Sequence, residues 1–204
     1  KNKKSKLFHG IKYICFNKSL KKNKKKVKKI PKNILIALSG YDPNNQSMKI
    51  LKSILKLNVE LKIKVICDKK YNLQYLKLSK NIKNKLVLIN EIKNINTLLN
   101  WSDIVVTGEG LLRFEAAVKG VPSIFLNNVE NSKKNTELIN EFLKLQTSLF
   151  FKFSNFKLIS FRSTFIKFYK NYKLRKIYSI NGKTKLDLSG AKKVSNIIFK
   201  YYLK

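Results

Sequence analysis

The sequence predicts an α/β protein with a Rossmann-like, doubly wound parallel sheet. Two observations carry that prediction. Buried-strand patterns alternate with helical patterns from residue 33 to residue 145, and the turn Thr107-Gly108-Glu109-Gly110 joins a β-branched strand to a helix. Strands that alternate with helices pair in parallel through right-handed crossovers. Ligands of such sheets bind beyond the carboxyl ends of the strands, so the turns that follow the strands are the candidate site.

Each element is predicted from its own local pattern. The strands are short apolar runs, and the helices place apolar side chains three and four positions apart. The predicted strands cover residues 33–38, 61–67, 86–89, 103–107 and the run that ends at 127. The predicted helices cover residues 46–57, 73–80, 95–101, 132–145 and 189–203, and one more begins at about 111. From 150 to 173 the chain is aromatic and basic without a clean period. We expect short elements with core aromatics there, and base stacking is the alternative.

The composition gives a formal charge of +34 over 204 residues, enough length for one full domain. Nearly all of the positive charge is lysine, and arginine occurs only at 113, 162 and 175. The favoured residue types mostly have AT-rich codons, so genome bias explains the charge more simply than selection for a polyanion. Since sequence-reading nucleic-acid proteins rely on arginine, we expect no dedicated nucleic-acid function. A polyanion-binding role of the lysine-rich residues 18–32 stays an alternative.

Cysteine, histidine and hydropathy patterns narrow the class of protein further. Cys15 and Cys67 are far apart, and His9 is the single histidine, so we expect neither a disulfide framework nor a zinc set, and no cofactor. No run approaches eighteen apolar residues, and the basic start lacks the apolar core of a signal peptide. We therefore expect a cytoplasmic protein, with peripheral membrane contact left open. A first residue other than methionine suggests a fragment of a longer chain.

The glycine turn has the outline of a phosphate site. Because it opens a helix, its free N–H groups point to the carboxyl edge of the sheet, where an anion would lie. Glu115 follows Leu111 by four residues and so shares its helix face. A diphosphate at the turn and a ribose diol at Glu115 would together describe a nucleotide. An ordinary βαβ turn with a solvated glutamate fits the spacing equally well.

Four sequence blocks resemble a family of GT-B enzymes. Residues 37–44 (ALSGYDPN) look like its "GGSDP" turn, and residues 101–122 are similar to its "AD…GG…E.aalGvP" block. Residues 187–194 (DLSGAKKV) are similar to its closing element. Residues 10–13 look like the end of its first domain. The family groups the UDP-sugar hydrolase of pseudaminic acid synthesis with spore-coat polysaccharide biosynthesis proteins. Both are relatives of glycosyltransferase family 28.

The resemblance implies that the chain is the C-terminal, nucleotide-binding half of such an enzyme. Residues 1–17 would be a remnant of the first domain, 18–32 a basic linker and 33–204 the Rossmann-like domain. The first domain would lie in cis or in a separate chain and would supply the general base. The expected function is therefore UDP-sugar binding within a hydrolase or glycosyltransferase of surface polysaccharide or nonulosonic acid biosynthesis, with no catalytic residue in this chain. A non-catalytic GT-B-like subunit is the main alternative.

The resemblance also implies roles for particular residues. Glu115 would hold the ribose. Glu109 would repel an anion unless it points away or contacts sugar, and Tyr41 and Leu111 replace small hydroxylated residues of the family. The expected diphosphate contacts are Thr107, Gly108, Glu109, Gly110 and Leu111; the base-proximal residues are Asn90, Glu91 and Ile92; and the sugar-side loop is Ser39, Gly40, Tyr41 and Asp42.

Overall fold

The computed structural model describes residues 6–18, 20, 26–38, 42, 44–79, 85–127, 133–152 and 156–202. A six-stranded, all-parallel sheet forms its centre, in the order β3-β2-β1-β4-β5-β6. This arrangement confirms the predicted doubly wound α/β fold, with the strand order reversing between β1 and β4. The strands are β1 (Asn33–Ala37), β2 (Lys62–Ile66), β3 (Lys85–Ile89), β4 (Ile104–Thr107), β5 (Ser123–Asn127) and β6 (Ser148–Lys152).

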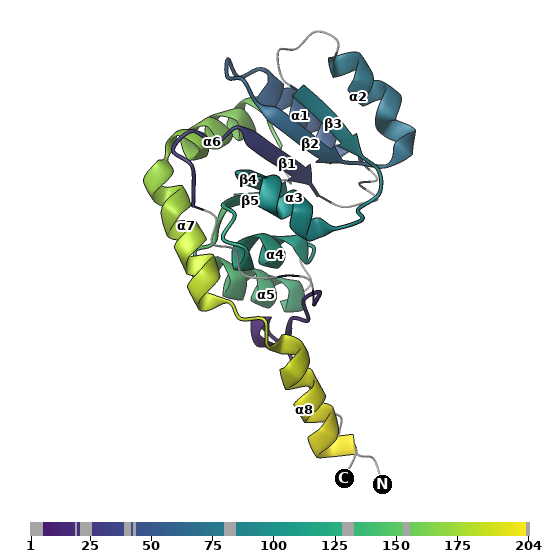
Figure 1. Cartoon of the computed structure of the whole chain (residues 1–204), viewed down its shortest axis with the longest axis vertical. Helices are drawn as coiled ribbons and strands as arrows, with labels where there is room; N and C mark the ends of the chain where they lie inside the picture. The colour runs from purple at the N-terminus through teal and green to yellow at the C-terminus, as the bar shows by residue number, and fades with distance from the viewer. Residues whose placement is uncertain are drawn as a thin grey trace.

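Helices connect these strands and cover both faces of the sheet (Figure 1). The predicted helices all occur, with ends that differ from the prediction by at most two residues where a bound was given. The helices are α1 (Gln46–Leu55), α2 (Asn72–Ser79), α3 (Ile95–Trp101), α4 (Leu112–Val118), α5 (Lys133–Lys144), α6 (Leu158–Lys170), α7 (Tyr172–Lys185) and α8 (Gly190–Tyr202), with short 3-10 turns η1 (Ile11–Tyr13) and η2 (Lys69–Tyr71).

Alternating side chains of the central strand build two separate cores. Ile34 and Ile36 of β1 pack with α1, α2 and α6 on one face of the sheet. Leu35 and Ala37 of the same strand pack with α3, α4 and α5 on the other. A strand buried on both faces has no polar position to spare, which explains the continuous apolar run Ile34 to Ala37. The central strands are therefore covered on both faces, and the carboxyl edge of the sheet is left to carry a site.

The structure from residue 146 to 188 differs from the expectation for residues 150–173, which were predicted to form short elements without a clean period. It forms the edge strand β6 and two full helices, α6 and α7, of 13 and 14 residues. Phe161, Phe165 and Phe168 repeat at helical spacing and are buried in the core. The expectation that these aromatics are core residues is confirmed. The prediction that this region lacks a clean period was therefore wrong. The helical spacing was hidden because lysines on the exposed face of α6 stand among the aromatic residues.

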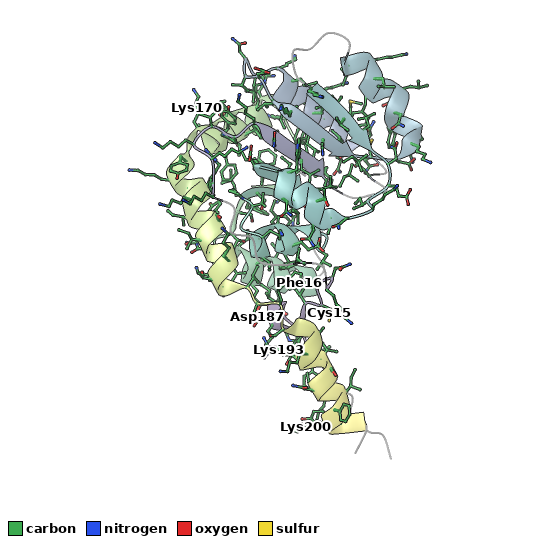
Figure 2. All side chains as sticks on the ribbon, viewed as in Figure 1. Cys15, Phe16, Lys170, Asp187, Lys193 and Lys200 are labelled. Carbon is green, nitrogen blue, oxygen red and sulfur yellow. The ribbon has the colours of Figure 1, made fainter. Side chains whose placement is uncertain are left out.

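The first described residues pack against α8 at one end of the molecule. The Ile11 amide donates to Glu141 Oε2 on α5 at 3.1 Å, and the Phe8 ring centre lies 6.0 Å from that of Tyr201. An ideal Cβ on Gly190 would meet the Ile14 carbonyl oxygen, so this segment and α8 touch backbone to backbone. Figure 1 shows α8 projecting from the sheet, and Figure 2 shows Cys15 and Phe16 at the same end as Asp187 and Lys193.

Residues 26–32, part of the proposed linker, are anchored to the domain. Arg175 of α7 is fully buried and donates to the Lys28 and Lys29 carbonyl oxygens, both at 2.8 Å. Asp103, just before β4, accepts from the Lys32 amide at 3.0 Å and from Lys28 Nζ at 3.1 Å. Buried charges are stable only when such partners satisfy them. These contacts fix the chain where it enters the sheet.

Candidate functional site

A pocket of about 260 Å³ opens at the carboxyl edge of the sheet. The ends of β1, β2 and β4 contribute to it, together with the chain after β3 and the start of α4. It therefore lies where the strand order reverses, the expected place for a ligand in this kind of sheet. The described residues that line it are Ala37, Leu38, Ile66, Ile92, Ile95, Thr107, Gly110, Leu111, Leu112 and Glu115.

The two glycines of the turn before α4 serve different purposes. A Cβ on Gly108 would lie 2.7 Å from the Leu38 carbonyl oxygen, so only glycine lets this turn approach the end of β1 so closely. A Cβ on Gly110 would meet nothing within 4 Å, because Gly110 faces the pocket. Gly108 thus sets the backbone path, and Gly110 leaves room for a ligand to approach the backbone.

Glu115 places a buried carboxylate in this pocket. The residue is 7% exposed, and within the described part of the chain its side chain makes no hydrogen bond or ion pair. Burial raises the pKa of the Glu115 carboxyl above its ordinary value. Of the described lining residues, it is the one with an ionisable side chain. The pocket therefore offers one hydrogen-bond acceptor of high strength amid largely apolar walls.

Glu115→Gln is expected to stabilise the unliganded fold at neutral pH. Because the folded-state pKa of Glu115 is raised, its ionisation costs stability; that cost is absent below the unfolded-state pKa and grows as pH rises through the folded-state pKa. The amide removes the cost. Urea unfolding at neutral pH and at about pH 4 checks this, since the difference should shrink at the lower pH. A variant less stable than wild type at neutral pH would contradict the argument.

The sugar-side loop is only partly described. Ser39, Gly40 and Tyr41 lie outside the described residues. Asp42 is buried, and its two carboxylate oxygens accept from the amides of Gln46 and Ser47, both at 2.9 Å. Asp42 therefore caps the first turn of α1, as its turn-forming type suggests, with both carboxylate oxygens accepting from main-chain amides.

The base-proximal residues separate into two kinds. The Asn90 amide donates to the Cys67 carbonyl oxygen at 2.9 Å and pairs with Asn72, so this side chain ties β3 to β2. Glu91 is exposed and does not line the pocket, whereas Ile92 does. Among the predicted diphosphate residues, Thr107, Gly110 and Leu111 line the pocket; Gly108 and Glu109 lie beside it.

Five lining residues were not predicted as site residues: Ala37, Leu38, Ile66, Ile95 and Leu112. Ile66 ends β2, Ile95 begins α3 and Leu112 begins α4. Ile66 could have been found, because the end of the second predicted strand must share an edge with the ends of the first and fourth. Ile95 and Leu112 carry no such signal, since apolar residues at helix starts more commonly serve the core.

Other features of the described residues bear on metal binding, membrane spanning and thiol chemistry. No group of three histidine, cysteine, aspartate or glutamate side chains within them could hold a metal ion. No helix among them is both long and apolar enough to cross a membrane. Cys15 is exposed and Cys67 is buried, and both are free thiols.

Comparison with known proteins gives one relative of similar sequence. No family model matches the chain. An uncharacterized protein of Methanocaldococcus jannaschii, MJ1062, is 30% identical over 148 residues, which cover 67% of this chain and 30% of that protein. The chain thus spans about a third of the length of this curated relative.

Solved structures share the fold. MurG of Acinetobacter baumannii superposes with a TM-score of 0.75 at 16% identity, over 87% of this chain and 55% of that one. The glycosyltransferase VinC, in complex with DTDP, gives a TM-score of 0.58 at 11% identity, over 82% of this chain and 41% of that one. The chain spans about half the length of these structures. The predicted fold is confirmed: the chain has an α/β, Rossmann-like fold that it shares with these structures.

Proposed function

We propose that this chain is the nucleotide-sugar-binding half of a GT-B enzyme and that its pocket takes a UDP-linked sugar. In this proposal the turn at residues 107–111 lies against the diphosphate, Glu115 accepts hydrogen bonds from the ribose hydroxyls, and residues 90–92 approach the base. The four sequence blocks support UDP as the nucleotide and a hydrolase or glycosyltransferase of surface polysaccharide or nonulosonic acid biosynthesis as the whole enzyme.

The carboxylate of Glu115 is the observation that carries the proposal. A buried carboxylate without a partner is costly, so a ligand that donates to it gains both the hydrogen bonds and the relief of that cost. A ribose diol offers two adjacent donors, and a carboxylate accepts two such bonds at once. The apolar side chains of Ile66, Ile92 and Ile95 give a base ring an apolar surface to pack on. Diol and ring together are the two parts of a nucleoside.

The pocket lining also supports an assignment of catalytic and binding roles to the two halves of the enzyme. Asp42 is occupied as a helix cap, and Glu115 is committed to the ribose, so neither is assigned as the general base. The other half of the enzyme would supply the base that activates water or a sugar hydroxyl. This chain would hold the donor and offer the backbone N–H groups of residues 108–111 to the charge that develops on the leaving diphosphate.

The first half is proposed to meet this chain at residues 1–17 and α8. Residues 6–16 pack on α8, and Figure 1 shows that helix projecting from the sheet. Residues 18–32 are proposed as the linker and 33–204 as the binding domain, whether the first half is in cis or a separate chain. Two free thiols fit a reducing compartment, and we propose the cytoplasm.

Calorimetric titration of the chain with UDP, 2′-deoxy-UDP, CMP and inorganic diphosphate tests the proposal. UDP is expected to bind best. Loss of the 2′-hydroxyl removes a hydrogen bond to a charged acceptor, so 2′-deoxy-UDP should bind roughly ten- to a hundredfold more weakly. Incubation of the chain alone with UDP-sugars is expected to release no sugar.

The same titration separates the alternatives. Equal binding of all four anions, with an affinity that falls steeply with salt, would replace the proposal with a polyanion-binding role. UDP binding without turnover after the first half is added would instead indicate a non-catalytic subunit. Sugar release by the chain alone would contradict the assignment of the base to the other half.

A further inference from the structure

Two asparagine side chains join the ends of β2 and β3 through a reciprocal amide pair. The Asn90 amide nitrogen donates to Asn72 Oδ1 at 2.9 Å, and the Asn72 amide nitrogen donates to Asn90 Oδ1 at 3.1 Å. The Asn90 nitrogen also donates to the Cys67 carbonyl oxygen at 2.9 Å. Asn90 therefore uses both of its N–H donors and its acceptor oxygen for contacts within the domain.

The backbone around the pair is held by hydrogen bonds of its own. Asp68 caps η2 with its carboxylate, which accepts from the Lys70 amide at 3.0 Å, and α2 begins directly after this turn at Asn72. The Cys67 amide donates to the Ile89 carbonyl oxygen at 3.1 Å, so β3 stays paired to β2 at its end. Both members of the pair thus project from a fixed backbone.

The segment that follows Asn90 has few contacts that could hold it in place. Residues 91–93 are exposed, and no hydrogen bond joins them to the rest of the described chain. The far end of the segment is fixed at Asn94, whose side chain accepts from the Asn96 amide at 2.9 Å and caps α3. Ile92 lies midway and lines the pocket, although 45% of it is exposed. Such a segment takes its position from its two anchors, and the amide pair is the first of them.

We propose that the Asn72–Asn90 pair positions Ile92 as the wall on which the base of the nucleotide packs. This inference rests on the proposed function of the same pocket. Neither asparagine lines the pocket, so both are positioning residues that act through the backbone of residues 91–93. Without the pair this segment would sample more conformations, and a ligand that needs one of them would bear the ordering cost. Base binding would weaken, whereas diphosphate binding at residues 107–111 would not depend on the pair.

Asn72→Ala and Asn90→Ala, titrated with UDP, uridine and inorganic diphosphate, test the proposal. The pair can favour the binding arrangement by no more than its own hydrogen bonds contribute, so each variant should bind UDP and uridine roughly two- to tenfold more weakly. The diphosphate affinity should not change. The double variant should be no weaker than Asn90→Ala, because the two residues act through one contact. Asn72→Ala is the milder change, since it leaves the bond from Asn90 to the Cys67 carbonyl oxygen.

Gln74→Ala is the matched control on the same helix. Gln74 Oε1 accepts from the Asn45 amide nitrogen at 2.9 Å, which is another exposed hydrogen bond between amide side chains. This bond joins α2 to the residue before α1, so its loss should leave the affinity for UDP and uridine unchanged. The proposal would be overturned if Gln74→Ala weakened uridine binding as much as Asn72→Ala. It would also be overturned if Asn72→Ala weakened diphosphate binding as much as uridine binding, because the effect would then be a general loosening of the domain.

A ligand-free measurement keeps this test separate from that of the proposed function. In ¹⁵N relaxation experiments on the unliganded chain, the Ile92 amide should be less ordered in Asn72→Ala and Asn90→Ala than in wild type and Gln74→Ala. An equally ordered Ile92 amide in all four chains would overturn the positioning role. Failure of wild type to bind UDP would overturn the proposed function, and the relaxation data would still decide whether the pair holds this segment.

Discussion

Glu115→Gln is expected to weaken UDP binding by roughly ten- to a hundredfold, equivalent to about 1.5 to 3 kcal/mol for hydrogen bonds to a charged acceptor. The carboxylate is 7% exposed and has no partner within the described part of the chain, so the ribose would be its main source of donors. The same variant is expected to be more stable without ligand at neutral pH. Higher stability of the variant together with weaker UDP binding would show that Glu115 serves binding at a cost in stability.

Glu137→Gln is the matched control for this titration. Glu137 lies on the exposed side of α5 and away from the pocket lining. Its substitution therefore removes the same charge at another place on the domain. If Glu115→Gln and Glu137→Gln change UDP affinity equally, only net charge matters. That result would contradict the ribose assignment. The ratio of UDP to 2′-deoxy-UDP affinity adds a second readout, since it should collapse in Glu115→Gln and persist in Glu137→Gln.

Gly182→Ala is expected to lower the free energy of unfolding by about 1–3 kcal/mol, the usual cost of overpacking. Gly182 lies in α7, where an ideal Cβ would meet the Ala117 carbonyl oxygen of α4 and lie 2.7 Å from its carbonyl carbon. The neighbour is backbone, so one helix must move. In an open helix the same change would gain roughly 1 kcal/mol from helix propensity. Thermal unfolding gives the sign directly.

Thr184→Ala provides the comparison on the same helix. Thr184 is exposed, and its hydroxyl bonds only within α7, to the Ile180 and Asn181 carbonyl oxygens. Its substitution is expected to change stability by less than about 0.5 kcal/mol. Because α4 carries Glu115, Gly182→Ala should also weaken UDP binding, whereas Thr184→Ala should not. Equal stability of both variants would show that α4 and α7 are not packed as closely as described.

The strands and the glycine turn at residues 107–110 were predictable because their sequence signals are local. A continuous apolar run such as that in β1 has few uses besides a strand buried on both faces, and Gly108-Glu109-Gly110 directly follows a β-branched strand. The end of the chain was harder. Phe161, Phe165 and Phe168 have helical spacing, but the further aromatics and lysines on either side of them hide it. In addition, β6 lies at the edge of the sheet and has exposed positions of its own.

The site itself was predicted only in outline. Residues of the central turn and Glu115 were named from spacing, and five of the predicted site residues line the pocket: Ile92, Thr107, Gly110, Leu111 and Glu115. Burial could not be predicted, because the walls around Glu115 come from the ends of three strands. The aromatic contacts of the buried Arg113 were equally hidden, because Phe125 belongs to β5 and Phe142 to α5. Such contacts between distant segments leave no local signal.

The amides that respond to UDP locate the bound nucleotide on the domain. Two-dimensional ¹H–¹⁵N NMR of the labelled chain, titrated with UDP, reports which amides change. We expect the shifts to concentrate at Gly108, Gly110, Leu111, Glu115 and Ile92, around the pocket at the carboxyl edge of the sheet. Shifts spread over the lysines of residues 26–32 and the exposed faces of α6 and α7, with the pocket amides unmoved, would contradict nucleotide binding in this pocket.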